Sequence, residues 1–182
     1  GNRFYPRSVS FLDRKAFHDV LGSVRVNIDN SLNKGLYTQI RTTYPVTGDK
    51  VARIEALMRE LVHLDIPFVR RVLDREEALA LLPAGEHEEK RKMMQASGVT
   101  RLPIYTCGDY SNFFYGYMVP SAGYIRHFEL RKYRNGVLLR FPSPLEPDRI
   151  PAYRDDNKLY QAFGESKRWG DLMGISYVSE LN

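Results

Sequence analysis

Aromatic and basic side chains alternate along residues 113–140, and this pattern could hold a flat, anionic ligand. The stretch opens with the sequence FFYGYMVP at 113–120 and becomes basic further along. The candidate ligand contacts in it are Tyr115, Tyr117, Arg126, Arg131, Lys132 and Arg140. Proteins hold nucleotides and single-stranded RNA by stacking rings and guanidinium groups in this way. The pattern also fits a sheet with an aromatic core and a charged edge, and we favour that second interpretation.

The single cysteine, Cys107, is the other side chain that could do chemistry. It ends an apolar segment, 102–107, and has no histidine near it in sequence. We therefore expect a small buried residue rather than a nucleophile. An ester-cleaving site could use Cys107 together with His127, which is distant in sequence, or alternatively Asp109.

Several motifs that would define a reaction are missing from the sequence. It contains no phosphate-binding loop of the G-x-x-x-x-G-K-[ST] type and no C-x-x-C, H-E-x-x-H or G-x-S-x-G. The four histidines are scattered along the chain. We therefore assign no catalytic residue, no metal ligand and no cofactor from the sequence.

The composition is that of a globular protein with one domain or two small ones. The chain has 182 residues, of which 43% are hydrophobic and 27% charged, and a net charge of +5. This charge permits weak attraction to phosphate or nucleic acid without requiring it. No apolar run reaches the roughly 18 residues of a membrane helix, and no signal peptide is visible. With one cysteine and hence no disulfide within the chain, we expect a cytoplasmic protein and no membrane partner.

The apolar spacing and turn residues predict helices interspersed with antiparallel strands. Helices are predicted over 8–21, 49–64, 75–82, 86–97 and 156–170. Strands are predicted over 24–28, 35–42, 67–73, 102–107, 112–118, 124–133 and 136–141. Thr47 or Asp49 can cap the second helix and Asp74 the third. Asn135-Gly136 is a strong hairpin signal between the last two strands.

This order predicts an α+β fold in which an antiparallel sheet packs with helices, because regular strand–helix–strand alternation is lacking. A proline-rich, irregular tract follows at about 142–155. The segment 142–182 is a candidate C-terminal helical extension.

In its order of segments the sequence resembles the second, editing-type domain of threonyl-tRNA synthetases, which is shared in outline with alanyl-tRNA synthetases. The segments that carry the resemblance are SVRVNIDNSLNKGLYTQI, VARIEALMRELVHLDIPFVRR and DYSNFFYGYMVPSAGYIRHFELRKY. YGYMVPSAGYIRHFEL, GVLLRFP and WGDLMGISYVSELN resemble more closely the same module in bacterial uridine kinase-like proteins. The resemblance covers about residues 2–182. It implies a parent protein with a TGS domain before this module and a P-loop kinase domain after it, and it places ATP and magnesium in that kinase domain alone.

The synthetase module carries H-x-x-x-H on its first helix and C-x-x-x-H before V-P, where four side chains bind zinc or support hydrolysis of mischarged tRNA. In this sequence the resemblance puts Arg7 and Phe11 at the first pair and Phe114 and Met118 at the second. A phenyl ring has no lone pair to donate, a thioether is a poor zinc ligand and a guanidinium repels a metal. The four side chains either fill the old cleft, which we favour, or form an apolar pocket with Arg7 at its mouth.

Three hypotheses follow. The first, which the resemblance favours, is a non-catalytic accessory or regulatory module of a uridine (nucleoside) kinase-like protein. The second is a divergent aminoacyl-tRNA deacylase. The third is a module that binds RNA or a nucleotide through the basic and aromatic stretch.

Overall fold

The computed structural model describes residues 4–22, 25–31, 35–41, 44–83 and 86–153. Within them the helices are α1 (Phe4–Leu21), α2 (Gly48–His63), α3 (Arg75–Leu81), α4 (His87–Ser97) and the short 3₁₀ turn η1 (Ala122–Tyr124). The strands are β1 (Arg25–Ser31), β2 (Gly35–Arg41), β3 (Val69–Asp74), β4 (Arg101–Cys107), β5 (Tyr110–Phe113), β6 (Glu129–Tyr133) and β7 (Gly136–Arg140). The predicted α+β class is confirmed. The helix predicted over 156–170 lies outside the described residues.

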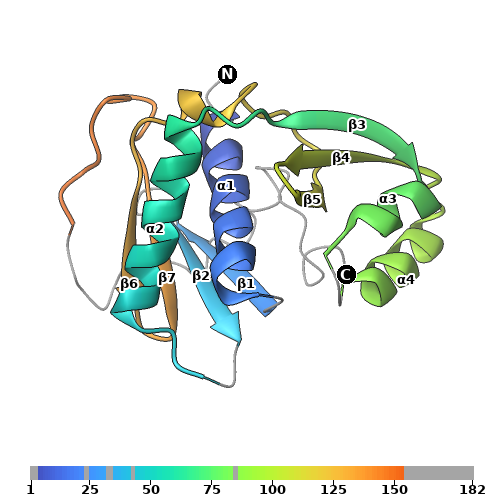
Figure 1. Ribbon diagram of the computed structural model, residues 1–182, viewed down its shortest axis with the longest axis horizontal. Coiled ribbons are helices and arrows are strands. Elements are labelled where there is room, and N and C mark those ends of the chain that lie inside the picture. The colour runs from blue at the N-terminus through green and yellow to red at the C-terminus, as the bar shows by residue number, and fades with distance from the viewer. Residues whose placement is uncertain (1–3, 23–24, 32–34, 42–43, 84–85, 154–182) are drawn as a thin grey trace.

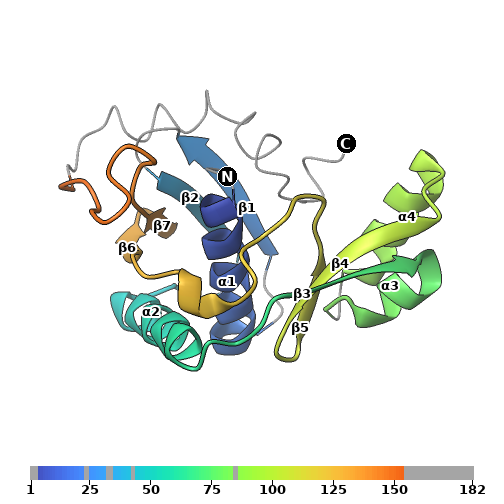
Figure 2. The ribbon, with the colours of Figure 1, turned by 90° about the horizontal axis from the view of Figure 1, so that it is seen from above.

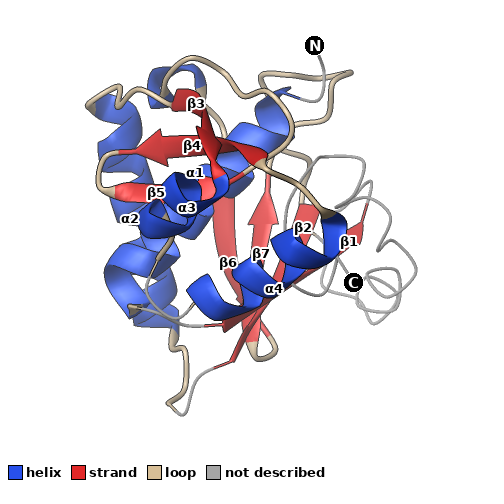
Figure 3. Cartoon of the chain, turned by 90° about the vertical axis from the view of Figure 1, so that its right-hand side faces the viewer, coloured by secondary structure: helices blue, strands red, loops and turns tan. Residues whose placement is uncertain are grey.

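The strands form two antiparallel sheets. A four-stranded sheet has the order β1-β2-β7-β6, and a three-stranded sheet has the order β3-β4-β5. Helices α1 and α2 cover one face of the larger sheet, while α3 and α4 lie beside the smaller one (Figures 1 and 3). The view from above shows these two parts side by side, with the chain passing between them along β3 and the loop after β5 (Figure 2).

Strand β4 belongs to the cores of both parts. Leu102 and Ile104 pack into the smaller core with Phe113, while Tyr105 and Cys107 point into the larger core with α1. Because successive side chains of a strand point to opposite faces, both faces of β4 are buried and the strand joins the two cores.

Helix α2 follows its sequence pattern closely. Val51, Ile54, Met58 and Leu61 are buried along one side, as their spacing predicts. The Thr47 hydroxyl accepts a hydrogen bond from the Lys50 amide at 3.3 Å, which confirms the expected cap. Asp74 takes the N-cap position of α3, but its carboxylate pairs with Arg101 at 2.8 Å and forms no cap hydrogen bond.

The strands predicted over 112–118 and 124–133 are shorter than expected. Strand β5 ends at Phe113, and the Phe114 amide still donates to the Pro103 carbonyl of β4 at 3.1 Å. Further along, side chains take over as acceptors: the Met118 amide donates to the Tyr105 hydroxyl at 3.0 Å and the Val119 amide to Ser8 Oγ at 2.9 Å. Likewise the His127 amide donates to the Tyr5 hydroxyl at 2.9 Å, and β6 begins only at Glu129. These segments are therefore held by side chains of α1 and β4, and they do not extend β5 or β6.

Within the described residues, no helix has the length and apolar character needed to cross a membrane.

Candidate functional site

Helix α1 and the loop after β5 bring together the positions that the synthetase resemblance singles out. Phe11 lies on α1 one turn after Arg7, and Phe114 and Met118 lie on the loop. The exposed fractions of Phe11, Phe114 and Met118 are 1%, 1% and 7%, and all three belong to the same hydrophobic core. The structure thus joins one end of the chain to a segment more than a hundred residues away.

The rings at this place form a packed cluster. The Phe11 ring meets Phe114 edge-on with centroids 6.2 Å apart, and it meets Phe68 in the same way at 6.0 Å. The rings of Tyr105 and Tyr110 complete the cluster, at 6.2 Å and 5.4 Å from Phe11. Edge-on and tilted pairs of this kind are favourable for aromatic rings. Such packing is what a filled cleft requires.

Arg7 lies at the border of this cluster, next to the glycine of the YGY sequence. It is half-buried, and a Cβ placed on Gly116 would come within 2.6 Å of its guanidinium carbon. A side chain at position 116 would require the flexible end of Arg7 to move aside. The fixed positive charge therefore lies against the loop backbone, and of the four positions it is the one closest to solvent.

One turn beyond Phe11, a buried lysine ties α1 to the turn between β4 and β5. The Lys15 ammonium contacts Asp19 Oδ2 at 2.7 Å and Asp109 Oδ1 at 3.0 Å. Burial alone would lower the pKa of Lys15, but the hydrogen bonds to the two carboxylates outweigh it and raise the pKa. Our sequence reasoning missed this residue. The Lys15–Asp19 spacing of four on a predicted helix was the only available signal.

The residues considered for ester cleavage are not arranged for it. Burial raises the pKa of the Cys107 thiol to about 11, so the thiol is protonated at neutral pH. The bond from Lys15 lowers the pKa of Asp109, which makes that carboxylate a weak base. His127 is held at its backbone by Tyr5, and its ring lies 3.9 Å from Asp148. In the part of the chain that the structure describes, no interaction joins Cys107 to the His127 ring.

The described residues contain no group of three or more His, Cys, Asp and Glu side chains that could hold a metal ion.

The basic and aromatic stretch is divided between two places in the fold. Tyr115 and Tyr117 are exposed on the loop after β5, with 49% and 55% of their surface accessible. Tyr115 meets Phe113 edge-on at 4.5 Å, and Arg70 of β3 lies over the Tyr117 ring at 4.6 Å. Arg126 is exposed in the loop between η1 and β6. Tyr115 and Tyr117 therefore lie on the same loop as Phe114 and Met118, while Arg126 lies further along the chain, beyond η1.

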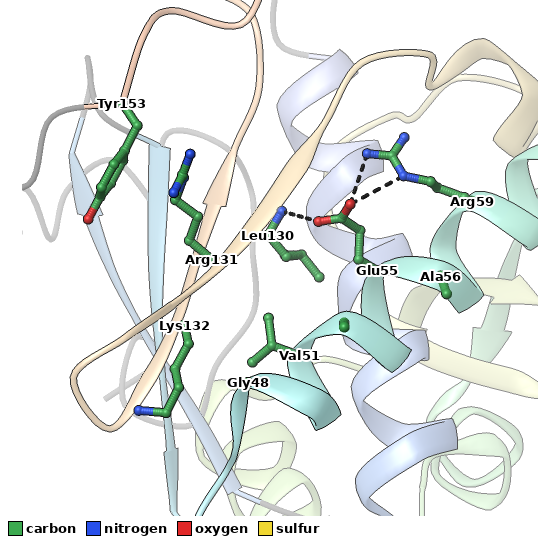
Figure 4. A pocket seen from close by; sticks show the side chains of 10 residues that line it. Gly48, Val51, Glu55, Ala56, Arg59, Leu130, Arg131, Lys132 and Tyr153 are labelled. Atoms are coloured by element: carbon green, nitrogen blue, oxygen red, sulfur yellow. Dashed lines mark hydrogen bonds and ion pairs between the residues drawn. The ribbon is translucent and has the colours of Figure 1, made fainter.

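Arg131, Lys132 and Arg140 lie instead on the β6–β7 hairpin. Arg131 and Lys132 line a groove of about 620 Å³ between α2 and β6 (Figure 4). Arg140 is buried, donates to Glu129 Oε2 at 2.9 Å and also donates to the Pro151 carbonyl. Its guanidinium therefore holds the hairpin to the segment around 151, a structural role that differs from the ligand contact that we proposed for it.

Comparison with known proteins shows which proteins this chain is similar to. Similar proteins include a threonine–tRNA ligase of Marinobacter nauticus, 31% identical over 126 residues, and one of Methylobacillus flagellatus, 30% identical over 126 residues. Each match covers 69% of this chain and 20% of the ligase. A third, from Geobacter sp., is 28% identical over 123 residues. These threonine–tRNA ligases are homologues of this chain.

The chain spans only about a fifth of the length of these curated relatives. The similarity supports a domain derived from threonyl-tRNA synthetase, and the α+β fold accords with it. No protein-family model matches the chain.

Proposed function

We propose that this chain is a non-catalytic accessory module, derived from a threonyl-tRNA synthetase editing domain, within a larger bacterial uridine kinase-like protein. The ring-packed interior at Phe11, Phe114 and Met118 is the observation that carries the proposal. A hydrolase needs an activated water or a general base at the ester, and this interior offers carbon and sulfur. The parent protein would be cytoplasmic and would supply a TGS domain and a P-loop kinase domain with its ATP and magnesium.

The same packing supports an accessory role, because it fixes the loop at 114–128 to α1. The loop at 114–128 is fixed to α1 by three contacts to side chains of the helix: Val119 to Ser8, His127 to Tyr5, and Gly116 against Arg7. A loop held in this way presents a rigid surface, including Tyr115 and Tyr117, to a neighbouring domain. Aromatic residues with one exposed face are common where domains and partners meet.

Two assays of the 182-residue chain test the catalytic part of the proposal. The first incubates it with seryl- and alanyl-tRNA and measures deacylation, with an editing-competent threonine–tRNA ligase as the positive control. The second supplies uridine, ATP and magnesium and measures phosphorylation. We expect neither product above the rate without protein. Deacylation would revive the deacylase hypothesis, and phosphorylation by this chain alone would refute the assignment of kinase chemistry to another domain.

The accessory part is tested in the parent protein. Tyr117→Ala removes an exposed ring, and Tyr124→Ala removes one of similar exposure from η1 as the matched control. If the loop after β5 contacts a neighbouring domain, Tyr117→Ala should change the temperature at which kinase activity is lost, or the KM for nucleoside. Tyr124→Ala should change these values less. Identical kinase behaviour of the parent with and without the whole module would contradict an accessory role.

A further inference from the structure

The open groove between α2 and β6 has the volume of a small-molecule site and is separate from the ring cluster. Its volume of about 620 Å³ lies within the usual range for ligand pockets, roughly 300–1,000 Å³. Its floor is apolar and made of small or aliphatic side chains: Val51, Ala52 and Ala56 from α2, and Leu130 from β6. Figure 4 shows Tyr153 and Arg131 along one wall and the helix along the other.

The charges that line the groove are predominantly positive. Arg59, Arg131 and Lys132 contribute cations, and Glu55 contributes the one carboxylate among the described lining residues. Both oxygens of Glu55 are already engaged. Oε1 accepts from Arg59 at 3.0 Å, and Oε2 accepts from the Leu130 amide at 2.8 Å. Glu55 therefore orders the wall and repels an incoming anion less than an unpaired carboxylate would.

Lys132 is the cation best placed to bind an anion. It is exposed, and its ammonium makes one weak hydrogen bond, to the Arg134 carbonyl at 3.2 Å. Among the described residues it has no carboxylate partner. A lysine ammonium with donors to spare at the edge of a groove is a typical phosphate-binding group.

The neighbouring wall provides a flat, rigid surface. The Arg131 guanidinium stacks on the Tyr153 ring at 4.1 Å and pairs with Glu129. Tyr153 in turn packs against the Tyr37, Tyr133 and Leu138 cluster, so it does not turn freely. A guanidinium fixed in this way can stack its open face on an aromatic base while its edge donates to an anion.

We propose that this groove binds a nucleoside monophosphate, with the phosphate at Lys132 and the base over the apolar floor, where Arg131 borders it. A phosphate monoester carries about −1.5 to −2 charge at neutral pH. Arg59 is paired with Glu55 and Arg131 with Glu129, so Lys132 supplies the positive charge that no described carboxylate balances. Inorganic phosphate would leave the apolar floor exposed to water. An acidic peptide would match the charge but would not use the flat surface of Arg131. The groove lies on other elements than the ring cluster, so this assignment stands independently of the proposed accessory role.

Titration calorimetry of the 182-residue chain with uridine 5′-monophosphate and adenosine 5′-monophosphate tests the assignment. Uridine and inorganic phosphate, which are the two parts of a mononucleotide, are titrated separately for comparison. We expect at least one mononucleotide to bind at least tenfold more tightly than either part. The affinity should fall as the salt concentration rises from about 20 to about 200 mM, because exposed charges are screened over this range.

Two variants locate the site, each with a matched control in the smaller part of the fold. Lys132→Gln removes the cation and should weaken binding about tenfold, while Lys92→Gln on α4 should not. Ala52→Leu fills the floor without changing charge and should weaken binding by a similar factor, while Ala80→Leu on α3 should not.

Three results would overturn the assignment. They are equal affinity for inorganic phosphate and mononucleotide, wild-type binding by both groove variants, and binding of single-stranded RNA or an acidic peptide with which mononucleotides do not compete. Failure here leaves the deacylation and phosphorylation assays unaffected, so the two proposals are judged separately.

Discussion

Phe114 and Tyr115 are adjacent in the chain, yet their side chains have opposite environments. Phe114 meets Phe11 and Tyr105 edge-on inside the larger core, whereas the Tyr115 ring is half exposed beside Phe113. At the scale of single residues, such burial decides what chemistry Phe11, Phe114 and Met118 can do. A phenyl ring surrounded by rings contributes packing and neither binds a metal nor transfers a proton.

Replacing Phe114 by alanine should lower the free energy of unfolding by about 3–5 kcal/mol, because it removes a fully buried ring and leaves a cavity. The neighbouring Tyr115→Ala variant is the control and should cost about 1 kcal/mol or less, since its ring is partly in water. Urea denaturation followed by circular dichroism measures both values. Equal losses in the two variants would show that position 114 is not part of the core.

Asp13 gives a second prediction at the residue scale. This aspartate is buried in α1, and burial raises its pKa well above the usual 3.8, although Arg14 opposes the change. A carboxyl group with a raised folded-state pKa stabilises the fold below its ordinary pKa. That contribution is lost as the pH rises through the folded-state value.

Asp13→Asn should therefore raise the free energy of unfolding at neutral pH and leave it nearly unchanged near pH 3, where the wild-type carboxyl is protonated. Denaturation at a series of pH values measures the difference, and Asp49→Asn, at an exposed position in α2, serves as the control. A loss of stability on Asp13→Asn that is the same at every pH would indicate a required charge and contradict this argument.

At the scale of elements, glycine decides how closely the strands of the larger sheet approach. A Cβ on Gly136 would lie 2.0 Å from the Thr38 carbonyl oxygen, and one on Gly35 would lie 2.2 Å from the Leu139 carbonyl oxygen. Strands β2 and β7 are paired through these positions, Gln39 with Gly136 and Leu36 with Leu139. The backbone contact leaves no room for a methyl group at either site.

Gly136→Ala should cost about 1–3 kcal/mol of stability, because β7 must move away from β2 to admit the methyl group. Gly48→Ala at the start of α2 is the matched control, since a Cβ there meets nothing within 4 Å. It should be neutral or stabilising by up to about 1 kcal/mol. Thermal denaturation compares the two, and an unchanged midpoint for Gly136→Ala would contradict the close approach of the strands.

At the scale of the whole molecule, β4 makes the two parts one cooperative unit. Its alternate side chains enter the two cores, and the loop after β5 is fixed to α1. The Lys15–Asp109 pair adds a charged contact between the same two parts. Loss of packing in the smaller part should therefore also destabilise the larger part.

Ile104→Ala, in the smaller core, should lower the free energy of unfolding by about 2–5 kcal/mol. It should also reduce hydrogen-exchange protection in β2 and β7 of the larger sheet. Val72→Ala on the exposed side of β3 is the control and should change protection little. Two separate unfolding transitions, with the larger sheet still protected in Ile104→Ala, would show that the parts are independent.

Local patterns were enough to predict the elements that depend on local interactions. The spacing in α2 and its Thr47 cap were confirmed, as was the β6–β7 hairpin. The hairpin turn lies at Arg134 and Asn135, as the predicted strand ends at 133 and 136 require, and Gly136 begins β7, where a Cβ would meet the Thr38 carbonyl of β2. The length of β5 was wrong, because distant side chains on α1 and β4 accept from backbone donors further along the chain.

The sequence by itself determined the α+β class, the position of most elements and the chemical types at Arg7, Phe11, Phe114 and Met118, because these depend on residue identity and short-range periodicity. The tertiary structure alone decided that three of these side chains share one interior, that Cys107 and His127 do not meet, and that Lys132 lines a groove with Arg59 and Tyr153. These facts depend on which distant segments pack together. Packing of that kind arises from the simultaneous burial of many side chains, which no short stretch of sequence specifies.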